Sequence, residues 1–169
     1  LAGFAYQIPE IALKASITYR SEVEHSVAVD ESSVGTGQLT AVMNNPALAG
    51  ANATGQTDIT TPQSVNLDFQ TGIMANTVAF ANVRWVNWKD FSIRPHAFGV
   101  ASKLAGPAVG KPDGFDLVAY TDDQWSANVG VGRKLNDQWA GNVSVGWDSG
   151  AGNPISTLGP TEGYWNLGL

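Results

Sequence analysis

Alternation of apolar and polar residues is clearest in the stretch WSANVGVGRKLNDQWAGNVSVGWD, residues 125–148. Apart from Gly141, every second residue of its two halves, at 125–131 and 139–147, is apolar or aromatic: Trp125, Ala127, Val129 and Val131, then Trp139, Val143, Val145 and Trp147. A period of two is that of a β-strand with one apolar face. Asn and Asp in the turn at 134–137 join the halves, so the stretch predicts a β-hairpin between strands at 116–133 and 138–148.

Further alternation predicts four more strands. The run at 12–29 alternates over eighteen residues, about 55 Å of strand, which is far longer than the usual strand of a soluble domain. Two other runs lie at 64–70 and 76–91, joined by a turn at Thr71-Gly72. The parity of the second run is imperfect, which indicates either a bulge near Asn87 or a locally apolar interior. The last strand is expected at 164–169. About six antiparallel strands are therefore predicted.

The predicted connections alternate in length. Short ones lie at 6–11, 72–75 and 134–137, and long ones at 30–62, 92–114 and 149–163. Short turns on one rim and long loops on the other are typical of outer-membrane β-barrels, whose strands are apolar outward and polar inward. Trp139 and Trp147 are eight residues apart on one face, about 26 Å of strand, which suits two aromatic girdles. The fold class predicted is all-β, part of an antiparallel up-and-down transmembrane β-barrel; the alternative is a water-soluble barrel or sandwich with these Trp in its core.

Composition excludes several functions. Nine Lys and Arg stand against fifteen Asp and Glu, a net charge of -6, so a nucleic-acid partner is not expected. The chain has no cysteine, which removes thiol catalysis and thiolate metal sites. His25 and His96 have no carboxylate at ligand spacing and no nucleophile arrangement beside them, so no metal, no cofactor and no enzymatic activity are expected. One acidic loop could bind Ca²⁺ or bridge lipopolysaccharide, or be an ordinary solvated loop; its residues are Asp113, Asp116, Asp122 and Asp123.

Charged residues indicate which face is the lumen. An Arg facing lipid at mid-bilayer costs roughly 2 to 4 kcal/mol, so the shared parity of Lys14, Arg20 and Arg84 marks the inward face. Arg20, Glu22 and Glu24 then form either a charged ladder that contacts a carboxylate ligand or a plug, or merely a wet lumen wall. The candidate ligand-contact residues on this face are Arg20, Asp68, Phe80 and Arg84.

One long connection is apolar for a surface loop. Within residues 37–50, Leu39, Val42 and Met43 follow the i, i+3, i+4 spacing of a helical face. With Leu48 they are expected to form an apolar patch at the outer end of the barrel, where a ligand tail leaves water. The alternative is that this face only packs on a neighbouring loop.

Three segments carry a family resemblance: YQIPEIALKASITYRS at 6–21, TPQSV at 61–65 and VRWVNWKDF at 83–91. The chain resembles the FadL-type long-chain fatty acid transporters of Gram-negative outer membranes, a family that also imports aromatic hydrocarbons. The resemblance implies a fourteen-stranded barrel plugged by an N-terminal hatch. It also implies that a hydrophobic ligand is captured by the outer loops, moves to an internal pocket and leaves sideways through the wall.

The resemblance places residues 1–169 at about the seventh to twelfth strands of a single barrel domain, without the hatch and the last strands. Six strands leave two bare edges, so the remaining strands are expected from the same barrel or another copy. The other expected partners are a long-chain fatty acid or aromatic hydrocarbon ligand, outer-membrane lipid and lipopolysaccharide. Passive uptake at the cell outer membrane is the leading hypothesis. A structural or adhesive barrel acting through its loops is the alternative, and a soluble lipocalin-like binder is third.

Overall fold

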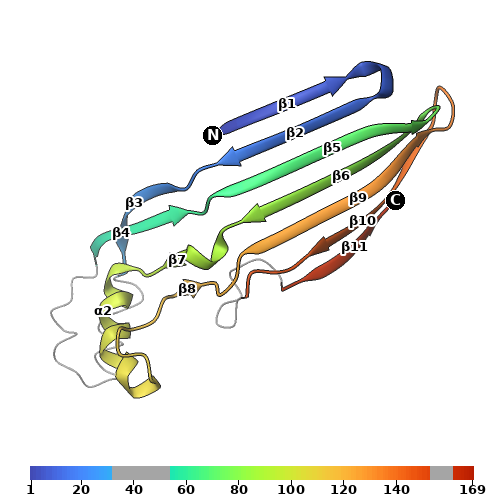
Figure 1. Ribbon diagram of the computed structural model, residues 1–169. Helices are drawn as coiled ribbons and strands as arrows, with labels where there is room; N and C mark the ends of the chain where they lie inside the picture. Colours follow the sequence, from blue (N-terminus) through green and yellow to red (C-terminus); the bar gives the residue numbers. More distant parts are fainter. Residues whose placement is uncertain (32–53, 153–161) are drawn as a thin grey trace.

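A computed structural model describes residues 1–31, 54–152 and 162–169. Its main element is a seven-stranded sheet in which every neighbouring pair is antiparallel, and strands follow one another in chain order (Figure 1). The strands are β1 (Ala2–Ile8), β2 (Leu13–Arg20), β5 (Ser64–Met74), β6 (Thr77–Val86), β9 (Gln124–Lys134), β10 (Ala140–Asp148) and β11 (Tyr164–Gly168). The predicted all-β, antiparallel up-and-down fold is confirmed.

The main sheet has one strand more than the six predicted, and the additional strand is β1. The sequence interpretation assigned residues 6–11 to a turn, whereas β1 continues to Ile8 and pairs with β2 over its whole length. Pro9 then opens a 3-10 turn, Pro9–Ile11, which ends at Ala12 with a φ of 53°. Pro9 directly after β1 is a turn signal, and the sequence interpretation extended that turn back to residue 6.

The prediction of a single strand at 12–29 is wrong, because this segment forms two strands. β2 ends at Arg20, and after residues 21–22 the strand β3 (Val23–Asp30) begins. Among the described residues β3 pairs with β4 (Thr54–Thr61) alone, in a separate sheet. Pro62 lies opposite this break, between β4 and β5, and it has no N–H for a ladder hydrogen bond. Arg20 therefore belongs to the main sheet, Glu22 to the segment between the strands and Glu24 to the outer hairpin, so the three residues do not lie on one strand as the sequence interpretation placed them.

Two predicted features of the β5–β6 pair are also wrong. The strand β5 passes through Thr71-Gly72 and ends at Met74; the turn is at 75–76, with Asn76 at a φ of 58°. The register shift lies between Gly72 and Met74. No bulge occurs near Asn87, because β6 ends at Val86 and a 3-10 helix, Trp88–Asp90, follows.

The hairpin of β9 and β10 forms as predicted but with different ends. Its turn covers 135–139, where the Asn136 Oδ1 accepts hydrogen bonds from the backbone N–H groups of Gln138 and Trp139. The expected strand at 116–133 begins only at Gln124; before it lies the two-residue strand β8 (Val118–Ala119), paired with β7 (Ser92–Ile93).

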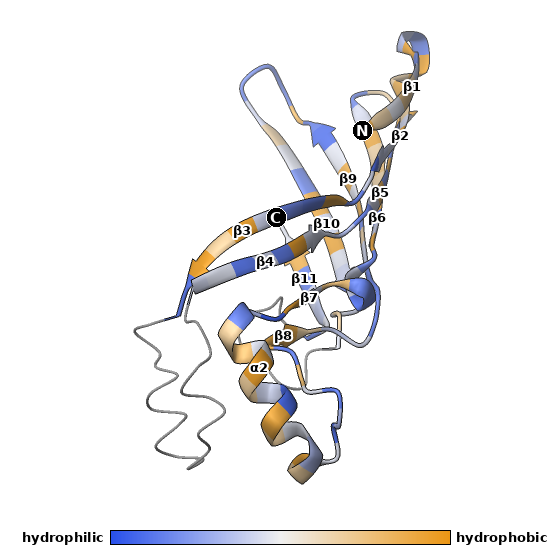
Figure 2. Cartoon of the chain, turned by 90° about the vertical axis from the view of Figure 1, so that its left-hand side faces the viewer, coloured by the Kyte–Doolittle hydropathy of each residue, from blue (hydrophilic) through white to orange (hydrophobic). Residues whose placement is uncertain are grey.

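The two ends of the sheet differ as expected. Tight turns join β1–β2, β5–β6 and β9–β10 at one end, called here the turn end, and the long connections all emerge at the other, the loop end (Figure 1). Turned by 90°, the sheet is seen to bend, and the β3–β4 hairpin leans away from it (Figure 2). Neither β1 nor β11 pairs on its outer side within the described residues.

The loop end holds a small core and a helix that the sequence interpretation treated as loop. Val118, Tyr120 and Ala151 are buried there against Trp88, Phe91 and Ile93. Helix α2 (His96–Ala105) has no capping side chain of its own. In the parts of the chain that the structure describes, no helix is long and apolar enough to cross a membrane.

A carboxylate from a residue far away in the sequence caps the N-terminus of α2. The two oxygens of Glu31 accept hydrogen bonds from the backbone N–H groups of Ala97 at 2.6 Å and Phe98 at 3.0 Å. Such a carboxylate satisfies two of the free N–H groups at a helix start and complements its dipole. Because the cap is 66 residues away in sequence, no local start signal indicated this helix.

Candidate functional site

The register divides the seven-stranded sheet into an apolar face and a polar face, because directly paired residues point to the same side. Three rows of paired residues cross the apolar face: Ala2, Tyr19, Val65, Trp85 and Trp125; Phe4, Ile17, Leu67, Val83, Ala127, Trp147 and Trp165; Tyr6, Ala15, Phe69, Ala81, Val129, Val145 and Leu167. Two shorter sets follow on the same face towards the turn end: Ile8 with Leu13, and Thr71, Ala79, Val131 and Val143. Only Thr71 among them is a polar, non-aromatic residue.

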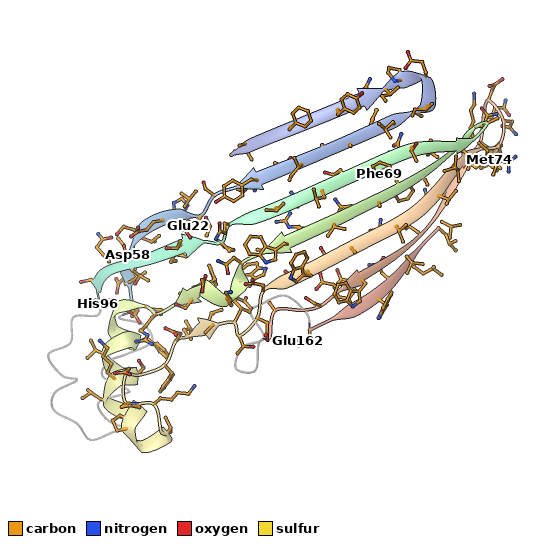
Figure 3. All side chains as sticks on the ribbon, in the orientation of Figure 1. Glu22, Asp58, Phe69, Met74, His96 and Glu162 are labelled. Atoms are coloured by element: carbon orange, nitrogen blue, oxygen red, sulfur yellow. The ribbon has the colours of Figure 1, made fainter. Side chains whose placement is uncertain are left out.

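Much of this apolar face is open. Val129, at the centre of the sheet, is 60% exposed, and Leu67 and Phe69 are almost half exposed. Figure 3 shows Phe69 along β5 and Met74 at its turn end. A contiguous apolar surface crossing seven strands exceeds what a monomer in water ordinarily leaves uncovered, so it marks a contact with lipid or with another apolar surface.

Aromatic side chains gather on the apolar face towards the loop end. The Trp85 Nε1 donates to the Asp123 carboxylate at 3.0 Å, and the Tyr19 hydroxyl donates to Gln63 at 3.0 Å. Both polar partners come from the connections at the loop end. Apolar rings with their polar atoms turned to one side are typical of residues at a membrane–water interface. Trp139 lies in the turn at the opposite end and is exposed.

Hydrogen-bonding groups line the polar face at mid-sheet. Asp68 accepts a 2.6 Å hydrogen bond from the Asn82 Nδ2 and a 3.4 Å bond from the Ser16 hydroxyl, so one carboxylate joins β2, β5 and β6. A groove of about 570 Å³ lies here. Its polar-face lining is Ala5, Gln7, Lys14, Ser16, Asp68, Gln70, Phe80 and Asn82.

The ring of Phe80 borders this groove on the side of β9. A Cβ atom on Gly130 would lie 2.4 Å from the Phe80 Cζ, so the ring of Phe80 rests on the glycine backbone. The absence of a side chain at Gly130 thus lets Phe80 lie across its neighbouring strand. The polar face thereby combines amide, hydroxyl and carboxylate groups with one apolar ring.

The candidate contact residues of β2, β5 and β6 all point to the polar face. Asp68 and Phe80 line the groove, whereas Arg20 and Arg84 lie nearer the loop end and outside its lining. Both Arg side chains are exposed. The described part of the chain shows no hydrogen bond or ion pair to either guanidinium. The other candidates, Leu39, Val42, Met43 and Leu48, lie outside the described residues.

Several groove residues were missed in the sequence interpretation. Gln7 was assigned to a turn because β1 was not recognised. Asn82, Ser16 and Gln70 were seen only as polar positions of an alternating pattern. Their parity was the available signal, but which polar positions meet across strands depends on register, which no local pattern specifies.

Three carboxylates of the acidic loop have side-chain partners within the chain. Asp116 pairs with Arg94 at 2.7 Å, Asp122 accepts from the Thr121 hydroxyl, and Asp123 accepts from Trp85. Among the described residues, no group of three or more His, Cys, Asp or Glu side chains could hold a metal ion.

Tyr120 provides a test of the loop-end core. Its ring lies 4.9 Å from that of Trp88, and burial raises the pKa of its hydroxyl above the ordinary value of 10.0. The folded state thus favours the neutral phenol. The contribution of Tyr120 to the free energy of unfolding is therefore complete below about pH 10 and is lost as pH rises through the raised pKa. We expect the loop-end core to loosen as Tyr120 ionises at high pH, and a Tyr120→Phe variant to lack this pH-dependent loosening when unfolding is followed against pH. A loosening that persists in that variant would assign it to another group.

Comparison with known proteins yields a likeness of fold. No family model matches the chain, and no curated protein matches it. Among solved structures, a FadL homologue of Pseudomonas aeruginosa superposes with a TM-score of 0.54. The chain's fold is FadL-like. The match covers 91% of this chain and 34% of the other, at 16% sequence identity. The chain therefore spans about a third of that protein's length, and the likeness concerns the fold alone.

Proposed function

We propose that this chain forms part of the wall of a Gram-negative outer-membrane barrel that takes up hydrophobic compounds passively and without catalysis. Long-chain fatty acids or aromatic hydrocarbons are the proposed cargo. The observation that carries the proposal is the FadL-like sheet with one continuous apolar face and one polar, grooved face. An apolar exterior suits lipid, and a polar interior suits a water-accessible lumen.

The polar face favours a cargo with an anionic end. Arg20 and Arg84 bring two exposed guanidinium groups towards the loop end, where a ligand arriving from outside enters. Deeper in the sheet, Phe80 offers an apolar surface beside the Asp68–Asn82 pair. In this proposal a carboxylate contacts the arginines and an apolar tail passes the ring. Leu39, Val42, Met43 and Leu48 would supply the first capture surface.

The experiment that tests the function is uptake in cells that lack their own transporter. Cells expressing the complete protein should accumulate a labelled long-chain fatty acid at limiting concentration, and heat-modifiable migration in gels should verify a folded barrel. A folded barrel that gives no uptake of either a fatty acid or an aromatic hydrocarbon would contradict the proposal and favour the structural or adhesive alternative.

The two arginines give a more specific prediction. Replacing Arg20 and Arg84 together by Gln removes charged hydrogen-bond donors worth about 1.5 to 3 kcal/mol each to a carboxylate. We expect at least a tenfold rise in the fatty acid concentration needed for half-maximal uptake, since about 1.4 kcal/mol corresponds to tenfold. The control is Lys103→Gln on α2, which should behave as the wild type. Equal loss for an uncharged hydrocarbon would show that the arginines shape the lumen and do not bind a carboxylate.

A further inference from the structure

The apolar face carries a groove of its own. Its volume is about 180 Å³, and its lining consists of Val65, Leu67, Val83, Trp85 and Trp125. The rings of Trp85 and Trp125 lie 6.5 Å apart and are tilted by 48°, so they do not stack closely over it. Across from Val83 on β9 is Ala127, which contributes only a methyl group to the face. The groove is thus a gap between large side chains on the outward side.

This groove lies where further strands of a barrel would not cover it. It belongs to β5, β6 and β9, each of which is paired on both sides in the sheet. Additional strands would join at the outer edges of β1 and β11. In an inserted barrel, what faces the groove is therefore the hydrocarbon of the bilayer.

A cation lies beside the loop-end side of the groove. The Lys89 Nζ lies 3.8 Å from the Asp123 carboxylate, which also accepts the Trp85 indole N–H. The Lys89 side chain is 54% exposed, so the residue remains accessible to a second anion beside this long contact. The neighbouring Asp90 carboxylate accepts a hydrogen bond from Asn87. An apolar slot next to an accessible ammonium matches a lipid that has an acyl chain below a phosphate.

We propose that the groove binds one acyl chain of a phosphorylated outer-leaflet glycolipid of the lipid A type, and that Lys89 contacts its phosphate. The inference rests on membrane insertion, as the proposed function does, but it does not depend on what the lumen carries. A site on the outward wall holds a structural lipid at a defined place on the barrel, apart from the uptake path.

Native mass spectrometry of the complete protein, purified in mild detergent and supplied with lipid A, tests this site. The wild type should retain one lipid A. Val83→Phe fills the groove and should lower retention about tenfold, which corresponds to losing contact with roughly two methylene groups. The matched control, Val129→Phe, enlarges an outward residue that does not line the groove and should retain lipid as the wild type does.

Two further measurements complete the test: lipid retention by a Lys89→Gln variant, and fatty acid uptake by Val83→Phe. Lys89→Gln should reduce retention of lipid A towards the level of its dephosphorylated form. No retention by the wild type, equal retention by Val83→Phe, or an equal loss in Val129→Phe would each overturn the site. Heat-modifiable migration verifies folding of every variant. Fatty acid uptake should be unchanged in Val83→Phe, so failure of the lipid site and failure of the transport function would be seen separately.

Discussion

A Val129→Arg substitution in the complete protein is expected to abolish most barrel assembly. Val129 is at the centre of the apolar face and 60% exposed. Arg in contact with lipid at mid-bilayer costs about 2 to 4 kcal/mol, whereas an Arg on an exposed surface in water costs almost nothing. The measurement is the fraction of heat-modifiable, membrane-inserted protein and its midpoint of unfolding in denaturant.

The adjacent Asn128 provides the matched control. Its side chain points to the polar face one residue away at nearly the same depth, paired with Asn82. Asn128 is half-buried, so the larger Arg has a packing cost of its own, but its guanidinium can extend to the water-accessible polar face; we therefore expect Asn128→Arg to assemble clearly better than Val129→Arg. If Val129→Arg assembles as well as Asn128→Arg, then lipid does not contact the apolar face, and the soluble alternative gains support.

Gly130→Ala is expected to destabilise the folded protein strongly. A methyl group there would lie 2.6 Å from the Val143 carbonyl oxygen as well as 2.4 Å from Phe80. Phe80 can rotate away, but the carbonyl belongs to the backbone of β10 and cannot move without disturbing the pairing of β9 and β10. We expect a destabilisation of about 1 to 3 kcal/mol, in the range for overpacked positions, measured as a lower midpoint of unfolding of the inserted protein.

Gly141→Ala serves as the comparison for this substitution. An added Cβ at Gly141 meets nothing within 4 Å, and alanine restricts the unfolded chain more than glycine does. The unfolding midpoint should therefore stay equal or rise slightly. A destabilisation of the same size at both glycines would point to a general need for flexible strands and not to the contact between Gly130 and its neighbours.

Local pattern was sufficient for the antiparallel all-β class and for the apolar and polar sides of the strands that it located, although it missed β1 and joined β2 and β3 into one strand. The alternation from Trp125 to Trp147 indicates strands, apolar side and turn within one short stretch, since the pleat puts every second side chain on one side. The same parity placed Arg20, Asp68, Phe80 and Arg84 on one face. The order of short and long connections indicated which rim carries the loops. All of these are properties of residues near one another in the chain.

Contacts between distant residues decided the rest. The break after β2 lies opposite Pro62, about forty positions away, which has no N–H to donate across from residues 21–22. Helix α2 begins where the distant Glu31 carboxylate caps it, so its start has no local signal. The groove exists because register brings Ser16, Asp68 and Asn82 together and lays Phe80 on Gly130. The sequence by itself determined which side of each strand is apolar, because alternation is local. Only the tertiary structure decided which residues meet across strands, because register and loop packing are set by partners far apart in the chain.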